Sequence, residues 1–434
     1  MKIHCIGIGG IGVSALAQYY LEKGHQVSGS DLAASEITDF LGKKGVTIFI
    51  GNKPENISQN IDVVIYSPAV KPENPEIQKA KVLGIKAQSY PEALGELTKN
   101  HYTIAISGSH GKSTTTALIA LLMIKAGFDP TVIVGTKLKE FGNSNFRMGK
   151  SNYLIIEACE YDSSFENYFP KITVVTNVDK EHLDYFKTFA NVVKEFKKFI
   201  AKLPAGGFLV ANKDDKNLVK ISHGTFTTKF YSLKQKETAN TKKIMNIPGQ
   251  HNVSNALAVL AVARILHIKD AVTFKSLSEY HGSWRRFEII KNSPYVLISD
   301  YGHHPNEVLV TLKATREKYP GKKIWCIFQP HQYQRTFYLF KDFVALFRKV
   351  NIDHVIITDI YDVAGREEKQ INQSVSSEKL VKKILRRGSG QVGKANVAYM
   401  PVNEAEKFVK ENIRKGEVLI IMGAGDIYKL TDQF

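Results

Sequence analysis

Short apolar runs and longer amphipathic segments alternate along the chain. The first hundred residues carry strand-like runs at 2–10, 26–31 and 61–70, and apolar residues recur at helical spacing over 11–23. Short apolar runs bounded by turn residues are typical of buried strands, and strands that alternate with helices are typical of a parallel sheet. We therefore predict a first α/β domain over residues 1–98.

The same alternation continues to the end of the chain. Further strand-like runs, each ending in a polar or glycine-containing loop, cover residues 102–108, 153–158, 172–178, 295–302, 323–330, 354–360 and 418–425. We predict a central domain over residues 99–282, with an irregular stretch at 222–243, and a third domain over residues 283–434. The predicted fold class is α/β with three domains, in which Rossmann-like first and last domains flank a central domain of the P-loop ATPase type.

Length and composition agree with this division. A chain of 434 residues exceeds what one hydrophobic core usually supports, and 43% hydrophobic with 23% charged residues is typical of a globular protein. The longest apolar run, residues 117–124, is far shorter than a membrane-spanning helix, and the amino-terminal residues lack the pattern of a signal peptide. Because only Cys5, Cys159 and Cys326 are present, widely separated, we expect a cytoplasmic protein without membrane insertion.

The formal net charge of +17 raises the question of an anionic partner. The lysines are spread along the chain, with the densest groups at residues 194–198 and 241–243, and no arginine-rich arm accompanies them. We interpret most of them as solvated helix faces and expect no nucleic-acid partner, so a nucleic-acid-binding ATPase is the weakest hypothesis. A positive field would still favour phosphate-bearing substrates.

The first glycine-rich loop, GIGGIG at residues 7–12, fits the dinucleotide-binding pattern. Gly7 suits a tight turn, Gly9 the close approach of a diphosphate and Gly12 the packing of the following helix. Asp31 ends the next strand-like run, at the spacing expected of an acid that binds a ribose hydroxyl. This loop alone leaves two hypotheses open, a NAD-dependent oxidoreductase and a protein that binds another diphosphate, such as a UDP-sugar.

The second glycine-rich loop, GSHGKS, is more specific. Gly108, Gly111, Lys112 and Ser113 lie between a strand-like run and an apolar helical segment. In this context backbone N–H groups cradle phosphates, the lysine reaches the terminal phosphates and the serine hydroxyl binds Mg²⁺. The loop is shorter than the full P-loop pattern, because Ile106 stands where the first glycine is expected. Two such loops imply two phosphorylated ligands, whereas a dehydrogenase needs only one.

Carboxylates and a histidine follow the neighbouring strand-like runs. Glu157 ends one run, with Glu160 close behind it, and His182 follows another. Mg²⁺ prefers oxygen ligands and accepts an imidazole when phosphates fill other positions. We therefore predict a Mg²⁺ site formed by Ser113, Glu157 and His182, and we give the soft ligand Cys159 a structural role.

These motifs together resemble a known family. The GSHGKS loop is followed, in order, by EACEYDSSF, TNVDKEHLD, GQHNVSNALA, WRRFE, DYGHHPNEV, FQPHQYQRT and GAGDIY. In this order they make the chain similar to the Mur ligases along essentially its whole length. Among the branches of that family, it most resembles the one that adds L-alanine to UDP-N-acetylmuramate. The branch that reattaches a recycled murein tripeptide is the nearer alternative, and a folate-glutamate ligase is a more distant one.

The resemblance implies an ATP-dependent amide ligase of peptidoglycan precursor synthesis. In such an enzyme ATP, the co-substrate, phosphorylates the lactyl carboxylate of UDP-N-acetylmuramate, and the amine of L-alanine then displaces phosphate from the acyl phosphate. Mg²⁺ is the implied cofactor. UDP-N-acetylmuramate, L-alanine and ATP are the implied partners, and the chain is expected to be a monomer or a homodimer.

The resemblance also assigns residues, position by position. The catalytic residues are Lys112, Glu157, His182, Asp300 and His304. The ATP-binding residues are Gly108, Ser109, His110, Gly111, Lys112, Ser113, Thr114, His251, Asn252, Asn255 and Arg286. The UDP-sugar-binding residues are Gly9, Gly10, Ile11, Gly12, Asp31 and Ser67. The amino-acid-binding residues are Tyr301, His331 and Arg335, where Arg335 is the natural partner of the alanine carboxylate.

Some assignments have alternatives. Asn252 and Asn255 could instead cap the helix that follows them. Gln332 stands where the family usually carries arginine, which leaves the identity of the amino acid open. Several Mur ligases carbamylate a lysine near the metal, and this chain has three candidates in that stretch, among which the sequence does not choose: Lys194, Lys197 and Lys198.

Overall fold

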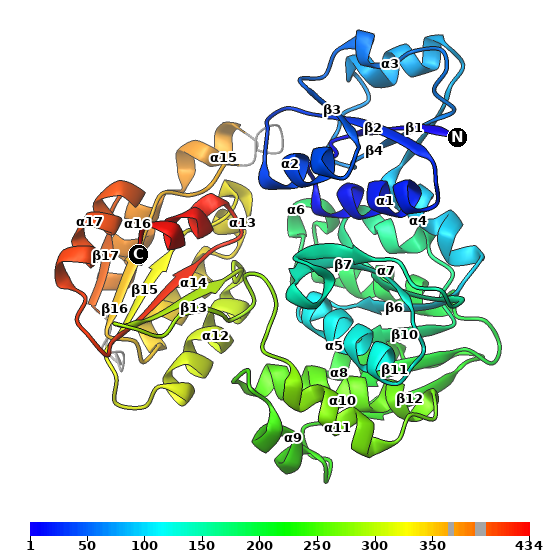
Figure 1. The fold of residues 1–434 in the computed structure, drawn as a ribbon. Coiled ribbons are helices and arrows are strands. Elements are labelled where there is room, and N and C mark those ends of the chain that lie inside the picture. The colour runs from blue at the N-terminus through cyan, green and yellow to red at the C-terminus, as the bar shows by residue number, and fades with distance from the viewer. Residues whose placement is uncertain (363–368, 387–395) are drawn as a thin grey trace. The chain divides into compact units, whose positions relative to one another are not determined.

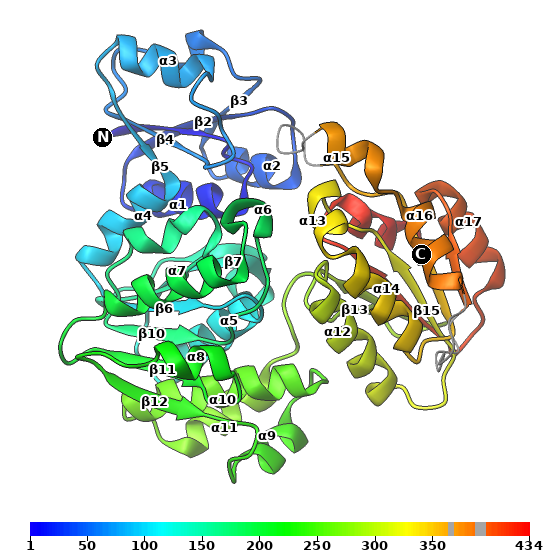
Figure 2. The same ribbon diagram turned by 180° about the vertical axis from the view of Figure 1, so that it is seen from behind.

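The computed structural model describes residues 1–362, 369–386 and 396–434 (Figures 1 and 2). Its backbone divides into two compact units. The amino-terminal unit comprises residues 1–179, 190–235 and 255–277, and the carboxyl-terminal unit comprises residues 180–189, 236–254 and 278–434. Three segments of the predicted central domain, residues 180–189, 236–254 and 278–282, therefore group with the carboxyl-terminal unit, and the exact domain boundaries stay predictions.

The first sheet has the strand order β3-β2-β1-β4-β5, with all strands parallel. Its strands are β1 (Lys2–Ile6), β2 (Gln26–Asp31), β3 (Thr47–Ile50), β4 (Val63–Tyr66) and β5 (Lys86–Ser89). Its helices are α1 (Ile11–Glu22), α2 (Glu36–Lys43), η1 (Pro54–Asn56), α3 (Pro75–Val82) and α4 (Tyr90–Lys99). The strand order reverses between β1 and β4, and ligands bind at such a switch point in open α/β sheets.

The second sheet has the order β12-β11-β10-β6-β9-β7-β8, and β8 is antiparallel to β7. Its strands are β6 (Tyr102–Ser107), β7 (Thr131–Leu138), β8 (Ser144–Arg147), β9 (Tyr153–Glu157), β10 (Ile172–Val175), β11 (Phe208–Asn212) and β12 (Thr227–Tyr231). The helices in this part of the chain are α5 (Lys112–Lys125), η2 (Lys139–Phe141), η3 (Tyr161–Asn167), α6 (Leu183–Phe186), α7 (Phe189–Ala201), α8 (Lys216–Ile221), α9 (Thr238–Ile244), α10 (Gln250–Ile265) and α11 (Asp270–Glu279).

The stretch predicted to be irregular, residues 222–243, contains strand β12 and most of helix α9. That prediction was wrong because β12 lies at the edge of the sheet. Most of its side chains face water and are threonine, lysine or an exposed phenylalanine, so the strand lacks the apolar signal of its buried neighbours.

Helix α1 fixes the first sheet to the second within the amino-terminal unit. Asn145 of β8 donates a hydrogen bond to the Ser14 hydroxyl, 3.0 Å away, and another to the Ile11 carbonyl. Gln18 donates to the Asn145 side chain over 3.0 Å and accepts from Ser144 over the same distance. Buried polar groups satisfied in this way specify one relative placement of their elements.

The third sheet has the order β13-β14-β18-β15-β16-β17, and only β13 is antiparallel to its neighbour. Its strands are β13 (Glu288–Lys291), β14 (Val296–Asp300), β15 (Ile324–Phe328), β16 (His354–Ile357), β17 (Asn396–Tyr399) and β18 (Val418–Met422). Its helices are α12 (Pro305–Lys318), α13 (Tyr333–Tyr338), α14 (Phe340–Lys349), α15 (Lys369–Ser374), α16 (Ser377–Leu385), α17 (Val402–Asn412) and η4 (Asp426–Gln433).

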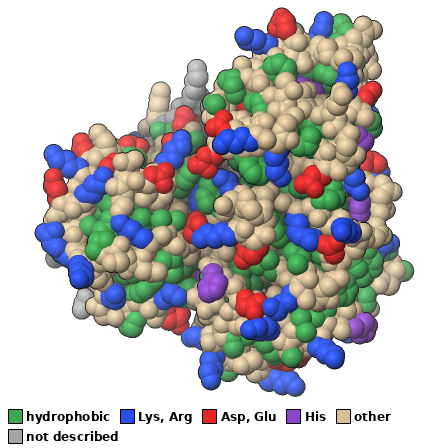
Figure 3. All heavy atoms as spheres, viewed as in Figure 1, with side chains coloured by type: hydrophobic (Ala, Val, Ile, Leu, Met, Phe, Trp, Pro, Cys, Tyr) green, Lys and Arg blue, Asp and Glu red, His purple; other side chains and the backbone are tan. Residues whose placement is uncertain are grey.

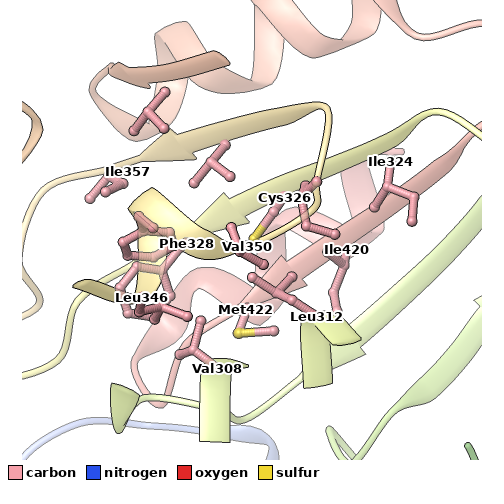
Figure 4. Close-up of a cluster of buried hydrophobic side chains, with 14 of the residues drawn as sticks. Val308, Leu312, Ile324, Cys326, Phe328, Leu346, Val350, Ile357, Ile420 and Met422 are labelled. Atoms are coloured by element: carbon pink, nitrogen blue, oxygen red, sulfur yellow. The ribbon is translucent and has the colours of Figure 1, made fainter. Parts of the chain in front are cut away.

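Apolar side chains on one face of this third sheet meet those of the helices that cover it. Cys326, Phe328 and Ile420 from the strands pack with Val308 and Leu312 of α12 (Figure 4). Strand β14, which ends at Asp300, contributes Val296 and Ile298 to the same cluster. The predicted α/β class, with three sheet-containing domains, is confirmed.

Two surface properties bear on the predicted partners. On the face shown in Figure 3, lysine and arginine side chains are interspersed with acidic and uncharged ones and form no continuous basic stripe. Within the described ranges, no helix combines the length and the apolar character needed to cross a membrane.

Candidate functional site

The first glycine-rich loop folds back onto the end of β2. The amides of Gly7 and Ile8 both donate to the carbonyl of Ser30, over 2.8 and 3.0 Å. Gly7 has a φ of +76°, a left-handed conformation that glycine adopts without strain. The Gly9 amide donates to the carboxylate of Asp31 over 2.8 Å. The loop and the predicted ribose-binding acid therefore lie together at the switch point.

The predicted UDP-sugar residues surround this loop. A Cβ atom at Gly9 would lie 2.9 Å from the Asp31 carboxylate, and one at Gly12 would lie 2.8 Å from the Tyr90 ring. A Cβ atom at Gly7 would lie 3.0 Å from Ser67, which follows β4. The remaining two predicted residues are Gly10, the N-cap of α1, and Ile11, its first residue. A side chain at Gly7, Gly9 or Gly12 would therefore collide with the residues that surround the loop.

The second glycine-rich loop connects β6 to α5 and packs against the segment after β10. Gly108 has a φ of +128°, and a Cβ atom there would lie 2.0 Å from the Thr176 hydroxyl. That hydroxyl donates to the His110 carbonyl over 2.6 Å, and the His110 amide donates to the Asn177 side chain over 2.9 Å. Gly111, at φ +85°, has no room for a side chain because Asn255 lies against it. The loop is thus held by groups that sequence reasoning did not select, Thr176 and Asn177.

Ser109 and His110 bind the end of the same neighbouring segment. The Asp179 amide donates to the Ser109 hydroxyl over 2.8 Å, and the His110 ring lies 3.1 Å from the Asp179 carboxylate. Thr114 lies one residue after Ser113 inside α5 and is buried. All seven predicted residues of the loop therefore belong to one structure at the start of α5.

Lys112 forms a buried ion pair. Its Nζ atom lies 2.9 and 3.1 Å from the two carboxylate oxygens of Glu160, and it donates to the Gly108 carbonyl over 2.6 Å. The Glu160 side chain is fully buried. Burial lowers the pKa of Lys112, but the Glu160 carboxylate outweighs that effect, so the net result is a raised pKa. Lys112 is therefore a permanent cation at the loop.

A pair of oxygen donors lies beside this cation. The Ser113 hydroxyl donates to the Glu157 carboxylate over 3.1 Å, and the other Glu157 oxygen accepts from the Gly135 amide over 2.9 Å. A Cβ atom at Gly135 would lie 2.6 Å from Glu157, so the strand β7 carries a glycine where the carboxylate passes. Two oxygen donors side by side fit a hard cation such as Mg²⁺. The third predicted ligand, His182, lies in the other unit and its role stays a prediction.

The side chains of Asn252 and Asn255 do not cap α10. Both residues lie inside the helix, after its first residue, Gln250. The Asn252 amide donates back to the Pro248 carbonyl over 2.7 Å, and Asn255 faces Gly111. The capping alternative is therefore wrong, whereas the assignment of Asn252, Asn255 and His251 to ATP stays a prediction.

In the carboxyl-terminal unit, Asp300 organises the loops around it. It is 7% exposed, and it accepts hydrogen bonds from the amides of Phe287 and Gly302, each over 2.8 Å. Burial raises the pKa of Asp300, although these two backbone donors oppose the shift. Arg286 lies over the Tyr301 ring, with 4.6 Å from its guanidinium carbon to the ring centre.

The other arginine of the WRRFE motif, Arg285, has a different role. It is 4% exposed and donates to the carbonyls of Gly423 and Gly425, the latter over 2.9 Å. Its guanidinium carbon also lies 4.5 Å from the centre of the Tyr428 ring. Arg285 therefore ties the end of β18 to the loop that carries Arg286, a function that the adjacent pair of arginines did not reveal in the sequence.

A buried carboxylate, Glu181, joins the predicted amino-acid-binding residues. Its two oxygens lie 3.1 Å from the Arg335 guanidinium and 3.5 Å from the His304 ring. His331 lies 3.1 Å from Arg335 and stacks on Tyr361. Burial tends to raise the pKa of Glu181, but Arg335 and the neighbouring histidines lower it well below its usual range.

His304 also has a structural part, since its Nδ1 atom accepts from the Asn306 amide at the start of α12. Gln332, in place of the usual arginine, has a φ of +69° and is the N-cap of α13. Glu181 was not selected from the sequence. Its only signal there was its place in the TNVDKEHLD motif, directly before His182.

Comparisons with known proteins agree with the motifs. Residues 2–102 match the model described as Mur ligase family, catalytic domain; residues 106–263 match the Mur ligase middle domain; and residues 285–425 match the Mur ligase, glutamate ligase domain. The chain is 41% identical to a UDP-N-acetylmuramate–L-alanine ligase of Aquifex aeolicus, over 100% of this chain and 97% of that protein. It is 40% identical to the ligase of the same name from Alkaliphilus metalliredigens, over 99% of this chain and 96% of that protein.

Solved structures give the same result. The crystal structure of a UDP-N-acetylmuramate–alanine ligase from Thermotoga maritima has a TM-score of 0.80 and 27% identity, over 100% of this chain and 98% of that one. A murein peptide ligase from Psychrobacter arcticus, at 21% identity and a TM-score of 0.73, shares the fold. Together, the two glycine-rich loops, the three family matches and the full-length relatives establish that this chain belongs to the Mur ligase family.

Proposed function

We propose that this chain is an ATP-dependent ligase that joins L-alanine to the lactyl carboxylate of UDP-N-acetylmuramate, a step of peptidoglycan precursor synthesis. The observation that carries the proposal is the pair of phosphate-binding loops in one compact unit, only the second of which has a lysine and a hydroxyl–carboxylate pair. A nicotinamide oxidoreductase would leave Lys112, Ser113 and Glu157 without a task. The full-length relatives named for the alanine-adding reaction favour that branch over tripeptide recycling.

In this proposal the loop between β6 and α5 binds ATP. A carboxylate is a poor electrophile, and transfer of the γ-phosphoryl group to the lactyl oxygen converts that oxygen into a leaving group. Backbone amides of Gly111 and Lys112 and the Lys112 cation face the developing negative charge. Glu160 holds the Lys112 ammonium close to the loop. When ATP binds, the ammonium turns from this position toward the phosphates.

The oxygens of Ser113 and Glu157 would hold Mg²⁺, with His182 as the third predicted ligand. When bound, the ion supplies positive charge to the phosphate oxygens. Glu157 is kept in place by the Gly135 amide and the Ser113 hydroxyl, so the carboxylate needs little reorganisation to bind a cation.

The first loop binds the UDP part of the sugar substrate. The amides at the start of α1 face the diphosphate, and Asp31 accepts from the ribose hydroxyls. Ser67 lies at the same switch point. These contacts bind substrate and transition state alike, so they act on the KM for the UDP-sugar.

Arg335 binds the carboxylate of the incoming amino acid, with His331 and Tyr301 beside it. The alanine amine attacks the acyl phosphate, and phosphate leaves with the electron pair of the broken C–O bond. In the free protein Glu181 occupies the Arg335 guanidinium. The alanine carboxylate then replaces the Glu181 carboxylate as the partner of the Arg335 guanidinium.

Phosphate release from ATP, in the presence of Mg²⁺, tests the proposal. Release is measured with UDP-N-acetylmuramate and each of the twenty amino acids in turn, and with the tripeptide L-alanyl-γ-D-glutamyl-meso-diaminopimelate. We expect release only with both the UDP-sugar and L-alanine. Release with another amine moves the assignment of the amine substrate, and release independent of the UDP-sugar contradicts the proposal.

A further inference from the structure

A second buried glutamate, Glu76, lies beneath the first glycine-rich loop and belongs to none of the predicted sites. It is the second residue of α3, and its side chain is fully buried. Asn74 caps this helix by accepting from the Glu76 amide over 2.9 Å, and Pro75 occupies the first helical position. The cap fixes the Glu76 backbone and aims its side chain under the sheet.

The carboxylate of Glu76 accepts two short hydrogen bonds from neutral donors. The Ser30 hydroxyl donates to one oxygen over 2.6 Å, and the Asn56 side chain donates to the other over 2.5 Å. Burial raises the pKa of Glu76, and these donors oppose the shift. An ionisable neighbour is His4, whose Nε2 atom lies 3.8 Å from Glu76 and has no hydrogen-bond partner in the described part of the chain.

His4 does not act as a counter-cation to Glu76 near neutral pH. Its Nδ1 atom lies 2.9 Å from the Ser28 hydroxyl, and burial lowers the pKa of His4 to about 4. An ionised Glu76 is therefore stabilised by hydrogen bonds alone. A buried carboxylate without a cation is costly, and an apolar side chain would fill the same space at lower cost. Because burying this carboxylate is unfavourable, we infer that its two oxygens serve to position the groups that they bind.

Both donors, Ser30 and Asn56, also contact the segments at the predicted UDP-sugar-binding edge of the first sheet. Ser30 is the residue whose carbonyl accepts the amides of Gly7 and Ile8 and so sets the turn of the loop. Asn56 also donates to the Gly51 carbonyl over 3.1 Å, and the Gly51 amide donates to the backbone carbonyl of Asp31 over 2.8 Å. One carboxylate thus holds the two segments that orient the glycine-rich loop and Asp31.

We propose that Glu76 is a positioning residue for the UDP-sugar, acting through Ser30 on the glycine-rich loop and through Asn56 and Gly51 on Asp31. This inference rests on the proposed function. Glu76 itself touches no substrate atom. Its loss should weaken the binding of the UDP part and leave the ATP site, on the second sheet, unchanged.

The experiment compares Glu76→Ala and Glu76→Gln with wild-type protein. The readouts are KM for UDP-N-acetylmuramate, KM for ATP and kcat from phosphate release, and binding of UDP alone by calorimetry. We expect Glu76→Ala to raise the KM for the UDP-sugar and the Kd for UDP about tenfold, because Ser30 and Asn56 lose their acceptor. KM for ATP and kcat should change less than about twofold. Glu76→Gln keeps one acceptor oxygen and should raise KM only about threefold.

Ile77→Ala is the matched control for a merely structural effect. Ile77 lies on the same helix and packs in the core beneath the first sheet, without a bond to Ser30 or Asn56. It should lower the melting temperature as much as Glu76→Ala does and leave the KM for the UDP-sugar within about twofold. If Ile77→Ala raises this KM equally, or if both Glu76 variants bind UDP as wild type does, the inference is overturned.

The same measurements separate failure of the inference from failure of the proposed function. If wild-type protein binds neither UDP nor UDP-N-acetylmuramate, the proposed function fails and the inference falls with it. If wild type binds both and the Glu76 variants bind them equally, the ligase assignment stands and only the role of Glu76 is wrong. Should Glu76→Ala not fold, Glu76→Gln decides, because a wild-type KM in that variant, with unchanged hydrogen exchange at residues 7–12, contradicts the inference.

Discussion

The two glycine-rich loops share a strand-loop-helix geometry but differ in charge. The first, at residues 7–12, contains no charged side chain, and its Gly9 amide is met by the Asp31 carboxylate. The second contains Lys112, whose ammonium lies 2.9 Å from Glu160, and Ser113, whose hydroxyl meets Glu157. Backbone dipoles suffice to hold a diphosphate that stays intact, whereas a phosphoryl group that moves requires charge placed where the transition state develops.

A buried glutamate supports each loop, and the two glutamates differ in the same way. Glu76 is held by neutral donors, namely the Ser30 and Asn56 side chains and the Lys53 backbone amide, and has a neutral histidine beside it. Glu160 is held by the Lys112 cation. The first carboxylate can only fix geometry. The second fixes geometry and also balances the charge of Lys112, which in the proposed function pairs with the ATP phosphates.

The largest expected effect follows from removing the cation of the second loop. Lys112→Met keeps an apolar stem and removes the charge that, in the proposed function, faces the transferred phosphoryl group, so kcat should fall about 10³-fold. KM for UDP-N-acetylmuramate should stay within about twofold, because the first loop is untouched. Steady-state phosphate release measures both values. A fall in kcat smaller than tenfold would contradict the contrast between the loops.

The double variant Lys112→Met with Glu160→Gln is the control for this change. Lys112→Met alone leaves Glu160 buried without its cation, which costs about 3–5 kcal/mol of unfolding free energy. Neutralising Glu160 removes that penalty. The double variant should therefore recover much of the lost thermal stability and none of the lost kcat, which separates the role of the charge in catalysis from its role in folding.

The next effect concerns the buried histidine beneath the first loop. Its folded-state pKa of about 4 lies below the ordinary 6.5, so the first domain loses stability as pH falls from 6.5 toward 4, by roughly 3 kcal/mol in all. Glu76 faces His4, and its raised pKa offsets part of this loss because the folded state takes up that proton more readily. The second loop also contains a histidine, His110, but its ring is only partly buried and lies 3.1 Å from the Asp179 carboxylate.

Hydrogen exchange of the amides of β1, corrected for the intrinsic rate, follows this loss between pH 7 and pH 4.5. His4→Asn is the matched variant, because its amide can replace the Nδ1 contact with Ser28 and does not titrate in this range. The variant should lose less protection on acidification than wild type. Equal losses in the two proteins would show that other groups carry the acid sensitivity.

The contrast between the loops was accessible to sequence reasoning only in part. GIGGIG and GSHGKS were each found from spacing, because glycine is required where the φ angle is positive or where a Cβ atom would collide, as at Gly7 and Gly108. The central strands of the three sheets, such as β4, β10 and β18, were found for a similar reason, since they are largely apolar. The edge strand β12 was missed because half-exposed strands carry no such pattern.

The roles of the residues that hold the two loops and Arg335 in place could not be predicted from motif spacing. Glu160 and Glu181 stood inside quoted motifs, but nothing in the sequence says which lysine or arginine each one pairs with. Glu76 and Asn56 are 20 residues apart and meet only because α3 and η1 pack under the first sheet. Such contacts depend on tertiary packing, so they become visible only when the strand order is known.

Neutralising Glu157, the predicted metal ligand beside the second loop, should have the next largest effect. Expressed as free energy, the expected change in kcat is somewhat smaller than the stability lost when His4 is protonated. Glu157→Gln retains an acceptor for the Gly135 amide or the Ser113 hydroxyl and loses the negative charge that favours a divalent cation. We expect kcat to fall about 10²-fold and the Mg²⁺ concentration for half-maximal rate to rise about tenfold. A Mg²⁺ titration of phosphate release measures both, and exposed Glu140→Gln should leave both unchanged. An unchanged Mg²⁺ requirement in Glu157→Gln contradicts the assignment.

The smallest expected effect comes from a substitution in the first loop, Gly9→Ala. In Gly9→Ala the new methyl group would lie 2.9 Å from the Asp31 carboxylate, so the loop and Asp31 must separate. The KM for UDP-N-acetylmuramate should rise about tenfold while kcat changes less than twofold, because the affected contacts hold a part of the substrate that does not react. Gly42→Ala, in helix α2 of the same domain, adds a methyl group 3.9 Å from Ile48 and should leave KM unchanged. A kcat that falls together with KM in Gly9→Ala would mean that the first loop also acts in the transition state, and the division of labour between the two loops would then be lost.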